Sequence, residues 1–184
     1  MNAPPRTGFE QRFDLEPGEG DLVLGLLGPL LADLGESRVS PLLSAIRADR
    51  PLSEGLGLPP GAGEVLYARA TQWFAVGRPE KAEPLFRILC MLDGASADHW
   101  VGHGVCLHLA DRIEPARLAF ETASRLRPGW AVPLFHLAAL AVRERRWGDA
   151  VAALEQFGLH ADADTPETMR REAQRLRTMA DSAS

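Results

Sequence analysis

Small and large apolar residues recur along the chain at a fixed interval, and this regularity predicts paired helices. When Gly63, Ala97 and Ala131 are set as first positions, equivalent residues fall 34 residues apart without an insertion. Position 8 is small and position 20 is alanine in all three copies, whereas positions 4 and 24 are large. The residues are Leu66, Trp100 and Leu134 at position 4; Ala70, Gly104 and Ala138 at position 8; Ala82, Ala116 and Ala150 at position 20; and Phe86, Phe120 and Leu154 at position 24.

This period and pattern are typical of the tetratricopeptide repeat, a pair of antiparallel helices. The small residues allow the two backbones to approach each other, and the large ones fill the space beside them. One repeat cannot bury its own apolar face, so that successive repeats must stack. We therefore predict an all-α fold with three tetratricopeptide repeats in a short right-handed superhelix.

Prolines and glycines predict where the helices begin. Gly77-Arg78-Pro79 separates the two helices of the first repeat, because proline suits the first turn of a helix. Pro115 and Pro133 also fall near expected helix starts. Pro84 lies inside the second helix of the first repeat, where we expect a kink or a later start.

The segments around the repeats complete the domain organisation. Residues 1–20 are rich in proline, glycine and charge and predict a mobile tail. Residues 21–62 hold N-terminal helices, one over 21–35 and one that starts at Ser40-Pro41, and a linker over 49–63. The repeats occupy 63–158, and residues 159–184 form a C-terminal capping helix and tail. The apolar N-terminal helices must be buried, either on the first repeat or against a second subunit.

The C-terminal helix is expected to open at Thr165-Pro166 and to cover the last apolar face of the stack. Its apolar stripe at helical spacing consists of Met169, Ala173, Leu176 and Ala180. Outside this stripe lie arginines that we interpret as a solvated face rather than a binding patch, namely Arg170, Arg171, Arg175 and Arg177.

Composition and charge narrow the possible functions. Hydrophobic residues make up 46% of the 184 residues, which is enough for a sizeable core. The net charge is −5 and the basic residues are spread out, so we expect neither nucleic acid nor a membrane as partner. The longest apolar run, over residues 22–34, is too short to span a membrane. Acidic residues precede it where a signal peptide would be positive, and we expect a cytoplasmic protein.

One short stretch suggests a metal site at first sight. His99, His103 and Cys106 share a face of the expected first helix of repeat two, while His108 lies on another face. The four cannot converge on one ion, and no carboxylate sits on that stripe. We therefore expect packed or partly exposed histidines, no metal and no cofactor. The chain also lacks a phosphate-binding glycine loop and a nucleophile elbow, so we expect no enzyme.

The predicted binding surface is the concave side of the superhelix, which the first helix of each repeat lines. Positions 5, 9 and 12 point into this groove: Tyr67, Thr71 and Phe74; Val101, Val105 and His108; and Phe135, Ala139 and Val142. No lysine or arginine is among them, although a groove for an acidic C-terminus needs inward cations. The composition favours an extended segment with apolar side chains. The alternative is that the protein's own N-terminus fills the groove.

Residues outside the general repeat pattern resemble the class II chaperones of type III secretion systems, which guard translocator proteins. The resemblance covers roughly residues 63–158. The matching motifs are Leu66-Tyr67, Phe74 with Gly77, Phe86 with Leu89-Cys90-Met91-Leu92-Asp93, Gly102-x-Gly104-x-Cys106, and Phe135-His136.

This resemblance implies a small, acidic, bacterial cytoplasmic chaperone without enzymatic activity. It would keep hydrophobic secreted translocators soluble by holding a Pro-x-Leu-x-x-Pro-like segment. Tyr67 and Phe74 would then be pocket residues with Val101, Val105 and Phe135 beside them, whereas Thr71 replaces a common aromatic. The resemblance also favours a homodimer through the N-terminal helices. The alternatives are a generic tetratricopeptide adaptor and a chaperone for the needle subunit.

Overall fold

The computed structural model describes residues 7, 10, 17–19, 21, 36–48, 50 and 52–183. In these residues every regular element is a helix. The chain divides into two compact units, residues 1–65 with 91–93 and residues 66–90 with 94–184. The predicted helix over 21–35 lies, apart from Asp21, outside the described residues, as does most of the predicted tail.

In the first unit, helix α3 (Glu36–Arg47) packs against the short helix α4 (Leu52–Gly55). Their contact is close, because a Cβ added at Gly55 would lie 2.9 Å from the Cβ of Ala45. Two predictions need correction here. The helix begins at Glu36 rather than at Ser40-Pro41, since a proline early in a helix removes only one backbone donor. The expected linker over 49–63 contains α4.

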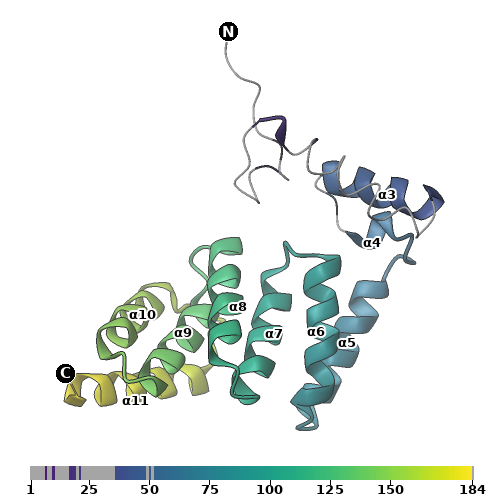
Figure 1. The fold of residues 1–184 in the computed structure, drawn as a ribbon. Helices are drawn as coiled ribbons and strands as arrows, with labels where there is room; N and C mark the ends of the chain where they lie inside the picture. The colour runs from purple at the N-terminus through teal and green to yellow at the C-terminus, as the bar shows by residue number, and fades with distance from the viewer. Residues whose placement is uncertain are drawn as a thin grey trace. The chain divides into compact units, whose positions relative to one another are not determined.

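The second unit holds the three predicted helix pairs and a final helix (Figure 1). The helices are α5 (Ala62–Ala75, whose first turn belongs to the first unit), α6 (Pro79–Leu92, whose last two residues belong to the first unit), α7 (Ala97–Leu109), α8 (Ile113–Leu126), α9 (Ala131–Arg143), α10 (Trp147–His160) and α11 (Glu167–Ala183). The second helix of each pair starts exactly one repeat after the previous one, at Pro79, Ile113 and Trp147. The predicted all-α fold is confirmed.

The small positions of the repeat are the points where helices touch. The alanines at positions 8 and 20 are completely buried: Ala70, Ala82, Ala116, Ala138 and Ala150. The large residues at position 24 are also buried, with Phe120 fully enclosed. Each helix pair therefore closes around the residues that the sequence pattern predicted.

Aromatic rings pack directly against the backbone of α7 at two glycines. A Cβ at Gly102 would lie only 2.3 Å from the ring of Phe86 on α6. A Cβ at Gly104 would lie 2.7 Å from the ring of Phe120 on α8. Both distances are shorter than carbon atoms tolerate, so only glycine allows α7 to approach these rings. Phe86 thereby joins repeat one to repeat two, and Phe120 closes repeat two.

The turn inside each repeat uses the same backbone geometry. The second residue after the end of the first helix has a positive φ in each repeat, in Gly77 (71°), Asp111 (62°) and Arg145 (58°). The next backbone N–H then donates to a carbonyl five residues earlier, with distances of 2.9, 2.9 and 2.8 Å in repeats one to three. This is the Schellman arrangement that ends many helices. Glycine suits this conformation, whereas aspartate and arginine adopt it at a cost.

Of the two alternatives predicted at Pro84, a kink or a later helix start, the structure excludes the later start. Helix α6 starts at Pro79 and continues through Pro84 to Leu92, so the expected later start is wrong. The proline leaves only the carbonyl of Glu80 without its helical donor. A single unpaired carbonyl near a helix start is readily solvated, which explains why the helix persists.

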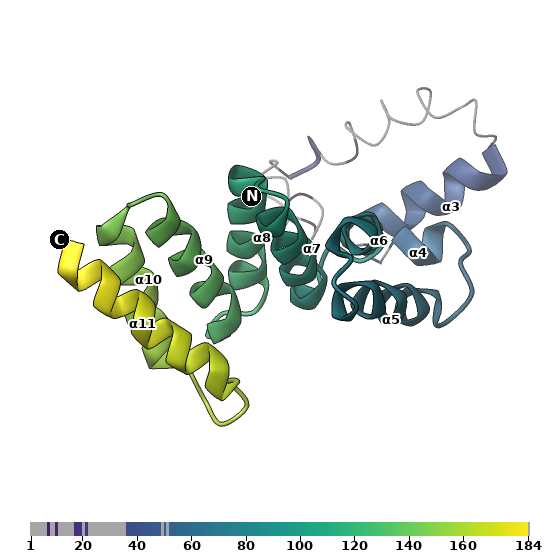
Figure 2. The same cartoon turned by 90° about the horizontal axis from the view of Figure 1, so that it is seen from below.

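Helix α11 closes the end of the stack. It packs against both α9 and α10, as Figure 2 shows. Three residues of its predicted stripe, Ala173, Leu176 and Ala180, are buried in one core with residues of those helices. The arginines on its other face pair with nearby acids, for example Arg175 with Glu172 at 2.8 Å. The capping role predicted for this helix agrees with these contacts.

The contacts of Gly102 lead to a stability prediction. Gly102→Ala should lower the free energy of unfolding by about 1–3 kcal/mol, because the new methyl group displaces the ring of Phe86. Gly158→Ala on α10 is the matched control, since a Cβ there meets nothing within 4 Å. The control should gain about 0.5–1 kcal/mol from helix propensity. Urea unfolding measures both, and equal effects would contradict the packing argument.

The left-handed turn residues lead to a second prediction. Arg145→Gly should raise the free energy of unfolding by about 1 kcal/mol, because glycine adopts the positive φ without strain. Arg145→Ala removes the same side chain but keeps the strain, so it should not stabilise. Thermal unfolding of the two variants distinguishes backbone relief from a charge effect.

Candidate peptide-binding face

The nine residues predicted to line the groove come from the first helix of each repeat. We call them the inner-helix face: Tyr67, Thr71 and Phe74 on α5; Val101, Val105 and His108 on α7; and Phe135, Ala139 and Val142 on α9. All nine belong to the second compact unit. Their exposure to solvent differs strongly from one repeat to the next.

The inner-helix face is most open in repeat one. The side chains of Tyr67 and Phe74 are 36% and 39% exposed, which is high for aromatic residues. The hydroxyl of Thr71 donates to the carbonyls of Tyr67 and Ala68 at 3.0 and 2.9 Å. Because its polar group is already bonded within α5, Thr71 adds little polarity to this part of the face.

Tyr67 is held at the junction of three helices. Its ring meets Phe86 of α6 edge-on at 5.9 Å and lies 5.7 Å from the ring of His99 on α7. Burial and the nearby Asp98 raise the pKa of Tyr67. The phenol therefore stays protonated at neutral pH and remains a hydrogen-bond donor.

Repeat two continues the apolar surface and ends in a polar group. Val101 is half-buried, and Val105 packs against the core that contains Phe120 and Leu140. Burial lowers the pKa of His108, and the charge of Arg143 lowers it further. The face is thus apolar along α7 and becomes polar at its end.

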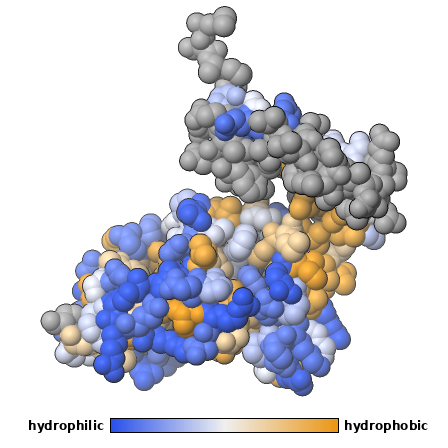
Figure 3. Space-filling model, in the orientation of Figure 1, coloured by the Kyte–Doolittle hydropathy of each residue, from blue (hydrophilic) through white to orange (hydrophobic). Residues whose placement is uncertain are grey.

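Repeat three is the closed end of the face. Val142 is only 8% exposed and belongs to the core that includes residues of α11. Phe135 and Ala139 pack against the same core, and the ring of Phe135 lies 6.0 Å from that of Phe157. Space-filling Figure 3 shows a mainly hydrophilic surface over α8 to α10 and hydrophobic surface toward α5 and α6. Side chains available to a ligand are concentrated in repeats one and two.

Charged residues border the face beside Tyr67. Arg127 follows α8 and donates to the carboxylate of Asp98 in the first turn of α7. Its guanidinium also stacks over the ring of Trp130 at 4.2 Å. Asp98, Arg127 and Trp130 were not predicted as site residues from the sequence, because none of them stands at a groove position of the repeat. The only available signal was an arginine that follows α8 shortly before a tryptophan.

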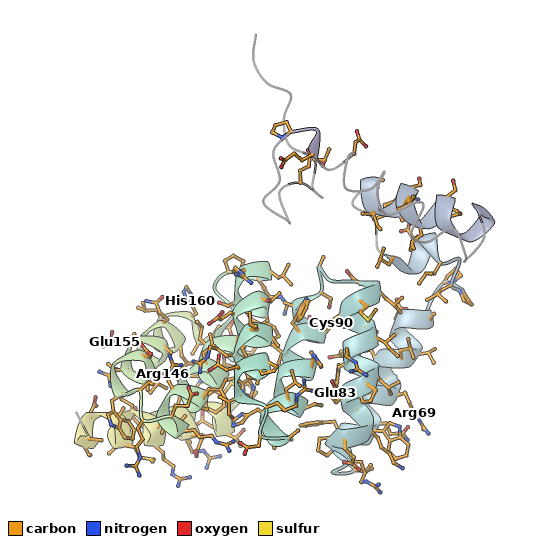
Figure 4. All side chains as sticks on the ribbon, viewed as in Figure 1. Arg69, Glu83, Cys90, Arg146, Glu155 and His160 are labelled. Carbon is orange, nitrogen blue, oxygen red and sulfur yellow. The ribbon has the colours of Figure 1, made fainter. Side chains whose placement is uncertain are left out.

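The histidine-rich stretch of α7 does not gather around one point. His99 contacts Tyr67, whereas His103 Nδ1 lies 3.6 Å from Oε1 of Glu83, which α6 carries beside α7 (Figure 4). Both of these atoms are buried without a hydrogen-bond partner. Burial raises the pKa of the Cys106 thiol to about 11, so it stays protonated. Across the described ranges, no three such side chains are arranged to hold a metal ion.

His136 is a half-buried, neutral histidine beneath the face. Its ring is stacked on Phe120 at 4.7 Å, and Phe135 meets it edge-on. Burial, together with the nearby His108, lowers the pKa of His136 to about 4. It therefore acts as an aromatic packing residue at neutral pH.

Within the described residues, every helix falls short of the length or hydropathy that a membrane-spanning segment requires.

The sequence is similar to that of a known chaperone protein. The chaperone protein SicA of Salmonella typhimurium is 25% identical over 142 residues, which cover 77% of this chain and 84% of SicA. No model of a protein family matches the chain.

The fold is that of solved translocator chaperones. SycD of Yersinia enterocolitica, solved with a peptide of the translocator YopD, aligns with a TM-score of 0.58 and 19% identity, covering 65% of this chain and 90% of SycD. PcrH, a protein of Pseudomonas aeruginosa, was solved with the chaperone-binding region of PopD. That structure aligns with a TM-score of 0.60 and 23% identity, covering 69% of this chain and 94% of PcrH. The resemblance to type III secretion chaperones is confirmed.

The burial of His136 leads to a pH prediction. An unfolded histidine titrates near 6.5 and folded His136 near 4, so protons bind the unfolded chain more tightly. Stability is therefore present above pH 6.5 and lost as the pH falls toward 4. His136 alone should remove about 2 kcal/mol between pH 7 and pH 5. His136→Phe preserves the stacking, and urea unfolding at both pH values should show a smaller loss than in the unsubstituted protein.

Proposed function

We propose that the chain is a type III secretion chaperone that binds an extended apolar segment of hydrophobic translocator proteins. The observation that carries this proposal is the fold that the chain shares with SycD and PcrH. SycD was solved with a peptide of the translocator YopD, and PcrH with the chaperone-binding regions of PopD and PopB. The inner-helix face is the proposed binding surface. Its exposed aromatic residues, Tyr67 and Phe74, support this assignment.

The proposed mechanism is the shielding of a client that aggregates in water. A translocator must be apolar enough to enter a membrane, so its apolar surface is unstable in aqueous solution. An extended segment laid across α5 and α7 buries its side chains against Tyr67, Phe74 and Val101. Only a few side chains take part, so an affinity on the order of micromolar fits this surface and permits release before export.

Chemistry at the site also fits a binding role without catalysis. The thiol of Cys106 stays protonated, and desolvation lowers the pKa of His103 and of His136 so that both are neutral at pH 7; these groups therefore present neither a nucleophile nor a proton-transfer pair to a ligand. We further propose that the chaperone acts in the bacterial cytoplasm without a cofactor. A homodimer through the N-terminal helices is part of the proposal, and SycD has been solved as an alternative dimer.

Co-expression with hydrophobic translocators tests this function. The unsubstituted protein should keep a translocator in the soluble fraction and co-purify with it. The double variant Tyr67→Asp and Phe74→Asp should reduce the soluble client at least tenfold, because two charges then occupy the apolar surface.

Leu159→Asp is the matched control, because Leu159 is 75% exposed on α10 and outside the inner-helix face. It introduces a charge in place of an exposed apolar residue and should leave client solubility unchanged. Circular dichroism checks that each variant is folded. Equal client recovery with folded forms of both variants would disprove the role of the inner-helix face.

A further inference from the structure

A cluster rich in hydrogen-bond donors borders the open end of the inner-helix face. We call it the Arg127 patch, and it consists of Tyr67 on α5, Asp98 on α7, Arg127 after α8 and Trp130 before α9. All four residues lie in the second compact unit. The side chains of Arg127 and Asp98 are 49% and 42% exposed, so a ligand on the face can reach them.

Arg127 is held in a defined position before any ligand arrives. Its Nη2 donates to Oδ2 of Asp98, and its Cζ lies 4.2 Å from the centre of the Trp130 ring. The ion pair restrains one edge of the planar guanidinium and the indole covers one of its faces. A group restrained in this way loses little conformational freedom when it binds a further acceptor.

Donors outnumber acceptors in the Arg127 patch. A guanidinium carries five N–H groups, and in Arg127 a single bond, to Asp98, engages them. Among the described residues, neither the hydroxyl of Tyr67 nor the indole N–H of Trp130 forms a hydrogen bond. Asp98 is the one carboxylate of the patch, and the dipole of α7 already stabilises it because it lies in the first turn. A ligand that displaces water from the patch must therefore supply hydrogen-bond acceptors to these donors.

The position of the Arg127 patch indicates that a segment bound on the inner-helix face would supply these acceptors. Tyr67 belongs to both the patch and the inner-helix face, so a segment bound on the face passes beside Arg127. None of the nine face residues is a lysine or arginine. A client segment with apolar side chains alone would satisfy the face and leave the donors of the patch unmatched. A carboxylate next to the apolar side chains satisfies both.

We propose that the Arg127 patch recognises a carboxylate on the client, adjacent to the apolar segment that the inner-helix face binds. The inference rests on the proposed function and specifies its partner: an apolar segment flanked by aspartate or glutamate. Arg127 donates to the client carboxylate through the N–H groups that Asp98 leaves free. Tyr67 contributes through its hydroxyl while its ring contacts the apolar side chains.

Synthetic peptides test this specificity directly. A panel of twelve-residue, end-blocked peptides with apolar cores of valine, leucine and proline is made in three forms, with aspartate, asparagine or lysine at either end of the core. Fluorescence anisotropy measures their affinity for the full chain. For cores that bind, the aspartate form at one end should bind about tenfold more tightly than the asparagine form. The difference should shrink in 1 M salt.

Variants identify the residue responsible. Arg127→Gln should abolish the difference between the aspartate and asparagine forms, and Arg127→Lys should retain part of it because the charge remains without the planar fork. Arg125→Gln is the matched control, since Arg125 is an exposed arginine on α8 that bonds to Thr122. It should leave the difference unchanged. Circular dichroism confirms folding of each variant.

The outcomes separate the two proposals. Equal binding of the three forms would overturn the role of Arg127 while the proposed chaperone function stands. A preference for aspartate that survives in Arg127→Gln would also overturn it. If no apolar core binds the unsubstituted protein in any form, both the carboxylate specificity and the proposed binding surface are wrong.

Discussion

The close contact of two phenylalanine rings with the backbone of α7 is the constraint on which the repeat stack depends. Phe86 reaches α7 from the preceding repeat at Gly102, and Phe120 reaches it from the same repeat at Gly104. Each ring occupies the space where any other residue would place a Cβ. Helix α7 is therefore fixed against both α6 and α8, and with it the part of the inner-helix face that repeat two supplies.

The functional surface follows from this stacking. Fixing α7 brings His99 against Tyr67 and sets Asp98 within reach of Arg127. The apolar centre and the charged border of the face are consequently products of the same helix placement. An apolar surface of this kind attracts many sequences, whereas a positioned guanidinium beside it selects among them. Under the proposed function, affinity and specificity would thus come from different residues.

Sequence reasoning succeeded where one residue type must recur in every repeat. Ala82, Ala116 and Ala150 stand one period apart because each lies where two helices touch, and all three are fully buried. The motif resemblance to secretion chaperones was correct for a similar reason, since its glycines Gly102 and Gly104 are packing positions. Neither argument needs knowledge of contacts between distant segments.

Features that depend on such contacts were beyond the sequence. The pair of Asp98 and Arg127 joins residues 29 positions apart, at a helix start and a helix end. Glu83 approaches His103 from another helix, although the stripe on α7 carries no carboxylate. The cap on the stack was predicted, but the burial of Val142 depends on α11 packing against α9 as well as α10. Whether the nine face residues bind a client remains a prediction.

The unequal exposure of the inner-helix face has a thermodynamic consequence. Tyr67 and Phe74 expose apolar surface to solvent, whereas Val142 has little exposed surface left to bury. A client held through those two aromatic side chains is held largely by the entropy of displaced water, with a negative heat-capacity change. Such an association weakens on cooling, so a client bound on this face would be held less firmly in a cold environment than in a warm one.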